Sequence, residues 1–195
     1  MGNVVVICNL TLDGVMQAPG HPEEDPRDGF THGGWAAPYS ADAMGRVMAE
    51  RSGRQGAMLF GRRTYQRFAS FWPAQPDNPF TDVLNKIQKY VVSTTLSSPL
   101  PWVNSTLLTG DLGDSVTALK TSEPERDLII LGSGVLIGSL LSQQLIDEFI
   151  LLFHPLVLGS GRRLFPDGGP GAEFRLTSAV GTTTGVVICS YRSGQ

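Results

Sequence analysis

The chain has 195 residues, of which 41% are hydrophobic and 17% are charged, and its formal net charge is -3. This length and composition are typical of one globular domain with a substantial core, and they exclude a disordered or fibrous chain. The small net charge argues against nucleic acid or a phospholipid surface as the main partner. No basic leader or apolar run of about 18 residues is present, so we expect a cytoplasmic protein with no membrane partner.

The two cysteines, Cys8 and Cys189, each lie inside an apolar, strand-like run. This setting predicts buried free thiols rather than a disulfide. His21 and His32 lie in an acidic, glycine-rich segment without the spacing of metal ligands. We therefore expect no metal site.

The first half of the chain alternates apolar strands with helices. Val4–Cys8 is continuously apolar and β-branched, which is typical of a strand buried on both faces of a mainly parallel sheet. Residues 11–39 hold five Gly and four Pro and predict a long irregular connection, a kind of loop that is usually functional. Ser40–Glu50 then predicts a helix with Ser40 as its N-cap.

Further strands are predicted where apolar runs lead into turns. A helix-compatible stretch follows Ala57–Phe60, Tyr90–Ser93 and Leu128–Leu131, and one more helix is predicted separately. The strands are Ala57–Phe60, Tyr90–Ser93, Ser105–Leu108 and Leu128–Leu131, and the helix is Asp111–Thr121. Phe149–Leu158 is a long apolar run, and Phe174–Ser178 and Val186–Tyr191 flank a glycine-threonine turn that predicts an antiparallel hairpin. The whole pattern predicts a mostly parallel sheet with an antiparallel edge.

A first glycine turn follows the strand that ends at Phe60. Gly61, Arg62, Arg63 and Thr64 stand where this strand becomes a helix. Unsatisfied N–H groups at a helix start attract anions, and a neighbouring arginine adds a forked positive charge. The turn is therefore a candidate phosphate site, with an ordinary strand-to-helix turn as an equal alternative.

A second glycine turn follows the strand that ends at Leu131. Its residues are Gly132, Ser133, Gly134, Val135 and Leu136. Glycines allow close approach of a ligand to the backbone, and the following helix start suits a pyrophosphate. The spacing is close to a Rossmann fingerprint, which leaves a classical NAD-dependent dehydrogenase as an alternative. However, such a fingerprint normally follows the first strand.

A third strand ends in Ser93 and Thr94 and carries no acid there. A carboxylate would repel a 2′-phosphate, whereas hydroxyls and a nearby arginine accept it. The sequence therefore favours NADPH over NADH.

The order of these segments resembles the dihydrofolate reductase-like superfamily, and most closely the RibD C-terminal domain, the reductase part of the bifunctional deaminase-reductase of riboflavin biosynthesis. The likeness covers nearly the whole chain: the Asn9–Met16 segment, the two glycine turns, and the run from Pro155 to Pro166. It implies a single three-layer α/β/α domain over residues 1–195 and a homodimer. It also implies cofactor contacts from the segments just described, with Asn9, Val15, Met16 and Leu131 among them.

The resemblance also indicates where a substrate would bind. It brings the first loop and the second helix to one cleft, so the predicted substrate contacts are Trp35, Tyr39, Ser40, Tyr65, Phe68 and His154, each weighed against a structural role. The position of the acid that binds the pterin in dihydrofolate reductases falls on Ser40. A hydroxyl cannot hold a protonated pterin, so efficient dihydrofolate reduction is not expected.

The predicted function is an NADPH-dependent reductase that passes hydride to a small heterocyclic or aminopyrimidine compound, similar to 5-amino-6-(5-phosphoribosylamino)uracil reductase. The cofactor supplies the chemistry and the protein supplies position, so catalytic side chains stay unassigned. The alternatives are an NADPH-binding module without turnover and a weak dihydrofolate reductase.

Overall fold

The computed structural model describes the backbone of residues 1–51 and 55–194, and their side chains except those of residues 40–42, 55 and 79. The chain divides into two compact units. Unit 1 comprises Met1–Val5 and Arg54–Leu145, and unit 2 comprises Val6–Gly53 and Ile146–Gln195.

Unit 1 is built on four parallel strands in the order β4-β3-β2-β5. Their bounds are Gln55–Gly61 for β2, Lys89–Val92 for β3, Ser105–Leu108 for β4 and Arg126–Leu131 for β5. The start of the first strand lies beside β5, where the Leu128 N–H donates to the Asn3 carbonyl at 2.7 Å. The predicted strands of this part of the chain are confirmed, with ends that shift by one to two residues.

The helical segments described in unit 1 are α2 (Arg62–Phe71), η3 (Trp72–Ala74) and α3 (Pro79–Lys86) between β2 and β3, α4 (Leu112–Ser122) between β4 and β5, and α5 (Gly134–Ser142) after β5. The predicted helix near Asp111 is confirmed, and Asp111 is its N-cap, since its carboxylate accepts from the Asp114 N–H at 3.0 Å. Phe60, Tyr65 and Trp102 lie in the core that these elements enclose.

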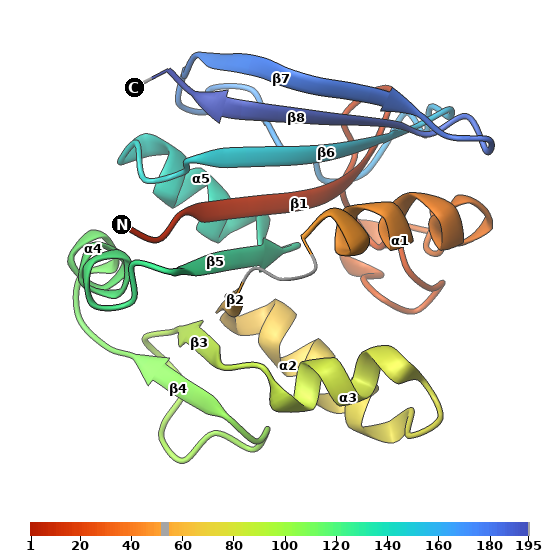
Figure 1. Ribbon diagram of the computed structural model, residues 1–195. Helices are drawn as coiled ribbons and strands as arrows, with labels where there is room; N and C mark the ends of the chain where they lie inside the picture. The colour runs from red at the N-terminus through yellow and green to blue at the C-terminus, as the bar shows by residue number, and fades with distance from the viewer. Residues whose placement is uncertain (52–54, 195) are drawn as a thin grey trace. The chain divides into compact units, whose positions relative to one another are not determined.

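Unit 2 holds the remaining strands in the order β1-β6-β8-β7, with β6-β8 and β8-β7 antiparallel. Their bounds are Val4–Thr11 for β1, Glu148–His154 for β6, Phe174–Gly181 for β7 and Val187–Ser193 for β8. Figure 1 shows β6, β8 and β7, drawn in blue tones, as neighbouring strands. The predicted C-terminal hairpin is confirmed. The predicted apolar run from Phe149 to Leu158 is a strand only as far as His154, because Pro155 has no N–H for the ladder.

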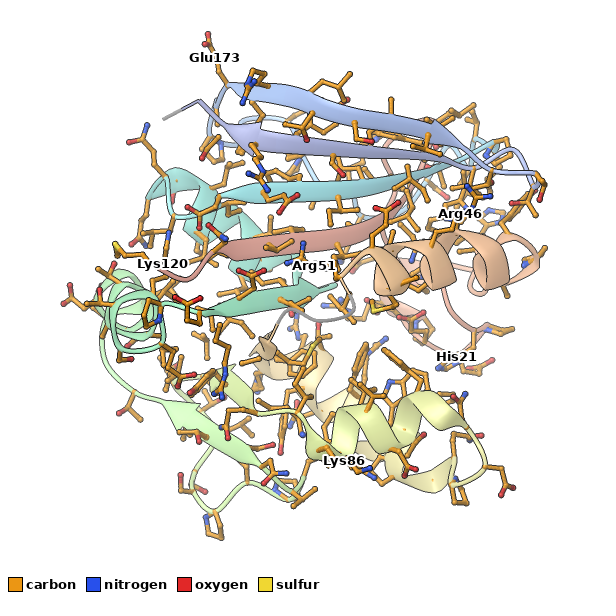
Figure 2. The ribbon with its side chains drawn as sticks, in the orientation of Figure 1. His21, Arg46, Arg51, Lys86, Lys120 and Glu173 are labelled. Atoms are coloured by element: carbon orange, nitrogen blue, oxygen red, sulfur yellow. The ribbon has the colours of Figure 1, made fainter. Side chains whose placement is uncertain are left out.

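The long connection predicted over residues 11–39 is confirmed, and it contains two short 3-10 turns, η1 (Arg27–Gly29) and η2 (Ala37–Tyr39). Helix α1 follows over Ser40–Glu50, as predicted. The predicted N-cap was wrong, because η2 runs directly into α1 and the cap position falls on Tyr39, whose backbone is already helical. Arg51, labelled in Figure 2, follows α1 and contacts the Glu148 carboxylate at 3.5 Å.

The fold class is α/β with a mostly parallel set of strands and an antiparallel C-terminal pair, as predicted. Both cysteines are free and buried, which confirms the expectation for the thiols, and burial raises the pKa of Cys8 to about 12. Within the described residues, none of the helices combines the length and the apolar character that crossing a bilayer requires.

Candidate functional site

The two glycine turns of unit 1 are joined directly to each other. The Gly61 N–H donates to the Ser133 hydroxyl at 3.0 Å, and the Ser133 N–H donates to the Thr64 hydroxyl at 3.1 Å. Because β2 and β5 are parallel neighbours, their carboxyl ends place both turns at the same edge of the unit 1 sheet. This edge is where open α/β sheets bind their ligands.

The second turn depends on an unusual backbone. Gly132 has a φ of +66°, and Ser133, the N-cap of α5, has a φ of +58°. A Cβ built at Gly132 would lie 3.4 Å from Thr64 Cγ2, so the backbone is both left-handed and closely approached. A glycine at this position therefore keeps the two turns together.

The start of each helix offers donors to an anion. Helix α2 begins at Arg62 and helix α5 at Gly134, and neither carries an acidic residue in its first turn. Arg62 and Arg63 are exposed and form no ion pair with a described residue. Thr64 uses its oxygen to accept from Ser133, so its own O–H remains available as a donor. These groups fit the phosphates of a dinucleotide, because two positive helix ends and two guanidinium groups meet at one edge.

The end of β3 at this edge carries the predicted Ser93 and Thr94. The Ser93 hydroxyl accepts from the Thr95 and Leu96 N–H groups at 3.1 and 3.0 Å, so it closes a turn. Thr94 is exposed. The strand end therefore presents an exposed hydroxyl at Thr94 and no carboxylate at Ser93 or Thr94.

The predicted cofactor residues fall on both units. Leu131, Gly134, Val135 and Leu136 belong to the second turn of unit 1; Val135 is exposed, whereas Leu136 is buried. Asn9, Val15 and Met16 belong to unit 2. Val15 is buried and bridges to Arg163, and Asn9 is half-buried.

In unit 2 three of the predicted substrate residues, Trp35, Tyr39 and His154, lie together, with His154 in contact with the other two. The His154 side chain is fully buried, its Nε2 lies 2.9 Å from Asn9 Oδ1, and its Nδ1 has no hydrogen-bond partner among the described residues. The rings of Trp35 and Tyr39 contact the imidazole edge-on, with centroid distances of 5.1 and 5.5 Å. Burial lowers the pKa of His154 to about 4, so the imidazole is neutral at pH 7 and is not a strong general acid there.

The other predicted substrate residues are placed differently. Tyr65 is 1% exposed, and its hydroxyl accepts from the Trp102 N–H at 3.0 Å, which is the position of a core residue. Phe68 packs half-buried against the same core. Ser40 is the first residue of α1, and its side chain lies outside the described residues.

Sequence reasoning missed how the first loop is held in unit 2. Asp13 accepts from the Thr11 hydroxyl at 2.6 Å and from the Leu158 and Gly159 N–H groups at 3.2 and 2.8 Å. These bonds, that of Thr11 first, lower the pKa of the Asp13 carboxyl. An Asp-Gly pair directly after a buried strand was the available signal, because aspartate often organises such turns through its side chain.

Gln17 forms a second anchor of this loop. Its amide donates to the carbonyls of Asp25 and Arg27, both at 3.0 Å, and accepts from the Arg162 N–H at 2.9 Å. Its own carbonyl accepts from the Trp35 indole at 2.7 Å. The Trp35 side chain is therefore held in place by a hydrogen bond to the backbone as well as by packing.

Two surface hollows of unit 1, of about 440 and 380 Å³, lie away from the glycine turns. They are lined by residues at the amino ends of the strands, among them Gln88, Asn104 and Arg126, and by Lys86, which Figure 2 labels. Their described lining residues include no pair of helix N-termini, so these hollows lack the anion-binding N–H groups that the opposite edge of the sheet offers. Among the described residues, no group of three or more potential ligands could hold a metal ion.

Known proteins resemble this chain over nearly its whole length. The model of the family described as the RibD C-terminal domain matches residues 3–188. A curated relative, the uncharacterized protein YyaP of Bacillus subtilis (strain 168), is 28% identical, and the alignment covers 96% of this chain and 93% of the relative.

Two solved structures share the fold. A putative riboflavin biosynthesis protein from Shewanella sp. PV-4 has a TM-score of 0.69 at 21% identity, covering 100% of both chains. A pyrimidine reductase-like protein from Corynebacterium diphtheriae has a TM-score of 0.65 at 12% identity, covering 100% of this chain and 92% of that one.

Proposed function

Because this chain belongs to the RibD C-terminal domain family, we propose that it is an NADPH-dependent reductase that passes hydride to a small heterocyclic substrate. The family as a whole supports an oxidoreductase role. The aminopyrimidine class is the substrate class we propose, and 5-amino-6-(5-phosphoribosylamino)uracil is its representative. A structural neighbour described as pyrimidine reductase-like supports this choice.

The observation that carries the proposal is the junction of the two glycine turns. Ser133 and Thr64 tie the starts of α2 and α5 together, without an acidic residue in either first turn and with Arg62 and Arg63 exposed beside them. Such a junction leaves backbone donors and positive charge for phosphate groups. A bound nicotinamide would supply the hydride, and the chain's own groups would bind and orient it.

The proposal is tested by calorimetric titration with NADPH and with NADH. We expect clear binding of NADPH and weaker binding of NADH. Arg62→Ala should lower the affinity for NADPH by about tenfold and reduce the preference, because one charge-assisted contact to phosphate is lost. Arg175→Ala, at an exposed position of β7, is the matched control and should change nothing. Absence of binding to both cofactors would contradict the proposal.

A second candidate is an NADPH-binding module without turnover. It is favoured by the low pKa of His154, which removes one proton donor, and by Ser40 at the position of the acid. Loss of NADPH absorbance on mixing with an aminopyrimidine or with dihydrofolate separates the two candidates. Steady consumption supports the reductase, whereas binding with no consumption supports the module.

The proposal includes a homodimer that works in the cytoplasm and one cooperative domain over residues 1–195. Sedimentation velocity would report the dimer. A single thermal transition followed by both near- and far-ultraviolet circular dichroism would report one domain.

A further inference from the structure

The buried end of unit 2 contains a polar contact that the reductase proposal leaves without a role. His154 is the last residue of β6, and Asn9 lies near the end of the neighbouring strand β1. Their side chains meet through His154 Nε2 and Asn9 Oδ1 at 2.9 Å. The imidazole is fully buried, whereas the Asn9 side chain is half-buried.

The identity of the atoms fixes the tautomer of His154. With the Asn9 amide in the orientation described, Oδ1 accepts hydrogen bonds and cannot donate them, so the hydrogen is on His154 Nε2. The opposite ring nitrogen, Nδ1, then carries only a lone pair; it is buried, and no side chain that the structure describes donates to it. The rings of Trp35 and Tyr39 pack against the imidazole in T-shaped contacts.

The same contact fixes the orientation of the Asn9 amide. With Oδ1 taken up by the imidazole, the Nδ2 group is the end that remains, and it forms no hydrogen bond with a described residue. An amide that turned over would bring N–H toward the imidazole and would need the other tautomer, whose buried N–H would then find no acceptor among the described residues. A buried N–H without an acceptor is the rarer and costlier arrangement.

We propose that His154 is a positioning residue that holds the Asn9 amide so that its N–H groups are offered to a carbonyl oxygen of a bound planar ring. The inference rests on the proposed function and adds the chemical group that the Asn9 amide would bind, a carbonyl on a planar ring. Two rings carry such a carbonyl, the carboxamide of the nicotinamide and the pyrimidine of the substrate. A neutral donor suits either, because neither carbonyl is charged in the ground state.

The variants separate positioning from packing. His154→Phe keeps a ring against Trp35 and Tyr39 but loses the donor, whereas His154→Gln can place an amide N–H where Nε2 stands. Asn9→Asp still accepts from His154 but no longer offers an N–H. Ile150→Val, a buried position on the same strand, is the control for a general loss of stability.

Three probes identify the ring that is bound. NADPH carries the nicotinamide, 2′-phospho-ADP-ribose lacks it, and 5,6-diaminouracil is a pyrimidine with ring carbonyls. We expect His154→Phe and Asn9→Asp to weaken either NADPH or 5,6-diaminouracil by about tenfold, the cost of one lost hydrogen bond. Binding of 2′-phospho-ADP-ribose should stay unchanged, and His154→Gln should recover affinity to within about twofold of the unmodified protein.

A spectroscopic readout does not depend on binding. Long-range nitrogen-proton spectra of the imidazole should show the neutral tautomer with hydrogen on Nε2 from pH 5 to pH 8 in the free protein, a range above the pKa of about 4. Hydrogen on Nδ1, or equal binding of the ring probes by His154→Phe and the unmodified protein, would overturn the inference. So would equal losses in His154→Phe and His154→Gln.

The outcomes also separate this inference from the function on which it rests. One outcome is that the unmodified protein binds NADPH and that His154→Phe binds all three probes with the same affinities as the unmodified protein. In that case only the positioning role fails. If the unmodified protein binds neither NADPH nor 5,6-diaminouracil, the proposed function fails and the positioning role fails with it.

Discussion

The two edges of the unit 1 sheet use their polar groups in opposite ways. At the carboxyl ends of the strands, α2 and α5 begin, and their first N–H groups and the guanidinium groups of Arg62 and Arg63 point to no described acid. At the amino ends, the polar groups satisfy one another: Lys89 Nζ donates to the Leu84 and Ile87 carbonyls at 2.6 and 2.8 Å. Donors left open by the fold mark a place for a ligand, whereas donors already used hold the fold together.

The largest effect is expected at the open edge, the carboxyl ends of the strands where the turns at Gly61 and Gly132 lie. Gly132→Val should abolish measurable NADPH binding, at least about 100-fold, because a branched side chain is strained at a φ of +66° and meets Thr64. Calorimetric titration measures the loss. Gly138→Ala, in the helix α5 that follows this turn, is the control, since a Cβ there has no neighbour within 4 Å, and it should bind NADPH as the unmodified protein does. Normal binding by Gly132→Val would show that the second turn does not approach the cofactor.

The second effect is expected at the closed edge, the amino ends of the strands where Lys89 lies. Lys89→Met keeps the alkyl chain near Trp102, whose ring lies 4.6 Å from Nζ, but removes both bonds to the end of α3. We expect the free energy of unfolding to fall by about 3 kcal/mol, because two buried carbonyls lose a charged donor. Urea unfolding measures this change.

The neighbouring Lys86 provides the control for that variant. It is exposed at the last position of α3, and Lys86→Met should change the free energy of unfolding by less than about 0.5 kcal/mol. Folded Lys89→Met should keep its affinity for NADPH, since the proposed cofactor site lies at the carboxyl ends of the strands. Similar stabilities of the two variants would remove Lys89 from the structural role given to it.

A smaller effect concerns Asn104, which also caps α3. Its side-chain amide donates to the Asn85 carbonyl at 2.9 Å, and its φ is +56°. Asn104→Ala should lower the free energy of unfolding by about 1 to 2 kcal/mol, because both the bond and the left-handed preference are lost. Asn104→Gly removes only the bond and should cost less. If the two variants are equally stable, backbone conformation plays no part at this position.

The open edge was predictable from the sequence because its signal is local. A glycine directly after an apolar strand identifies the turn, and both turns, at Gly61 and Gly132, lie where they were expected. The strands were predictable for the same reason, since continuous apolar runs are typical of parallel strands. Ser133 is a partial exception: its place in the turn was predicted, but its bond to Gly61, across 72 positions of sequence, was not.

The closed edge and the loop anchors were not predictable, because their bonds join residues without a periodic pattern. A lysine such as Lys89 at the start of a strand is ordinarily exposed, and only the tertiary structure shows its contact with the end of α3. Tyr65 illustrates the opposite difficulty. Its place in the helix that the family resemblance brings to the cleft favoured a ligand contact, whereas the structure shows its hydroxyl bonded to the Trp102 N–H in the core.

The smallest effect is a pH dependence of the free energy of unfolding, which tests the role of Lys89 at the closed edge. Burial lowers the pKa of Lys89 from 10.5 to about 8 in the folded protein. Between these two values the unfolded chain binds more protons than the folded one, so this group makes the protein more stable as the pH rises from about 8 to 10.5. The neutral amine still donates to both carbonyls, so its bonds survive the loss of the proton.

The matching measurement compares the unmodified protein with Lys89→Met by urea unfolding at pH 7.5, 9 and 10. Tyr90, whose pKa burial and the bond to Glu123 raise to about 12, acts equally in both proteins and cancels from the difference. We expect the advantage of the unmodified protein to grow with pH. A constant or shrinking difference would mean that the lysine is not held in the desolvated, closed edge, and the contrast between the two edges would then rest on the open edge alone.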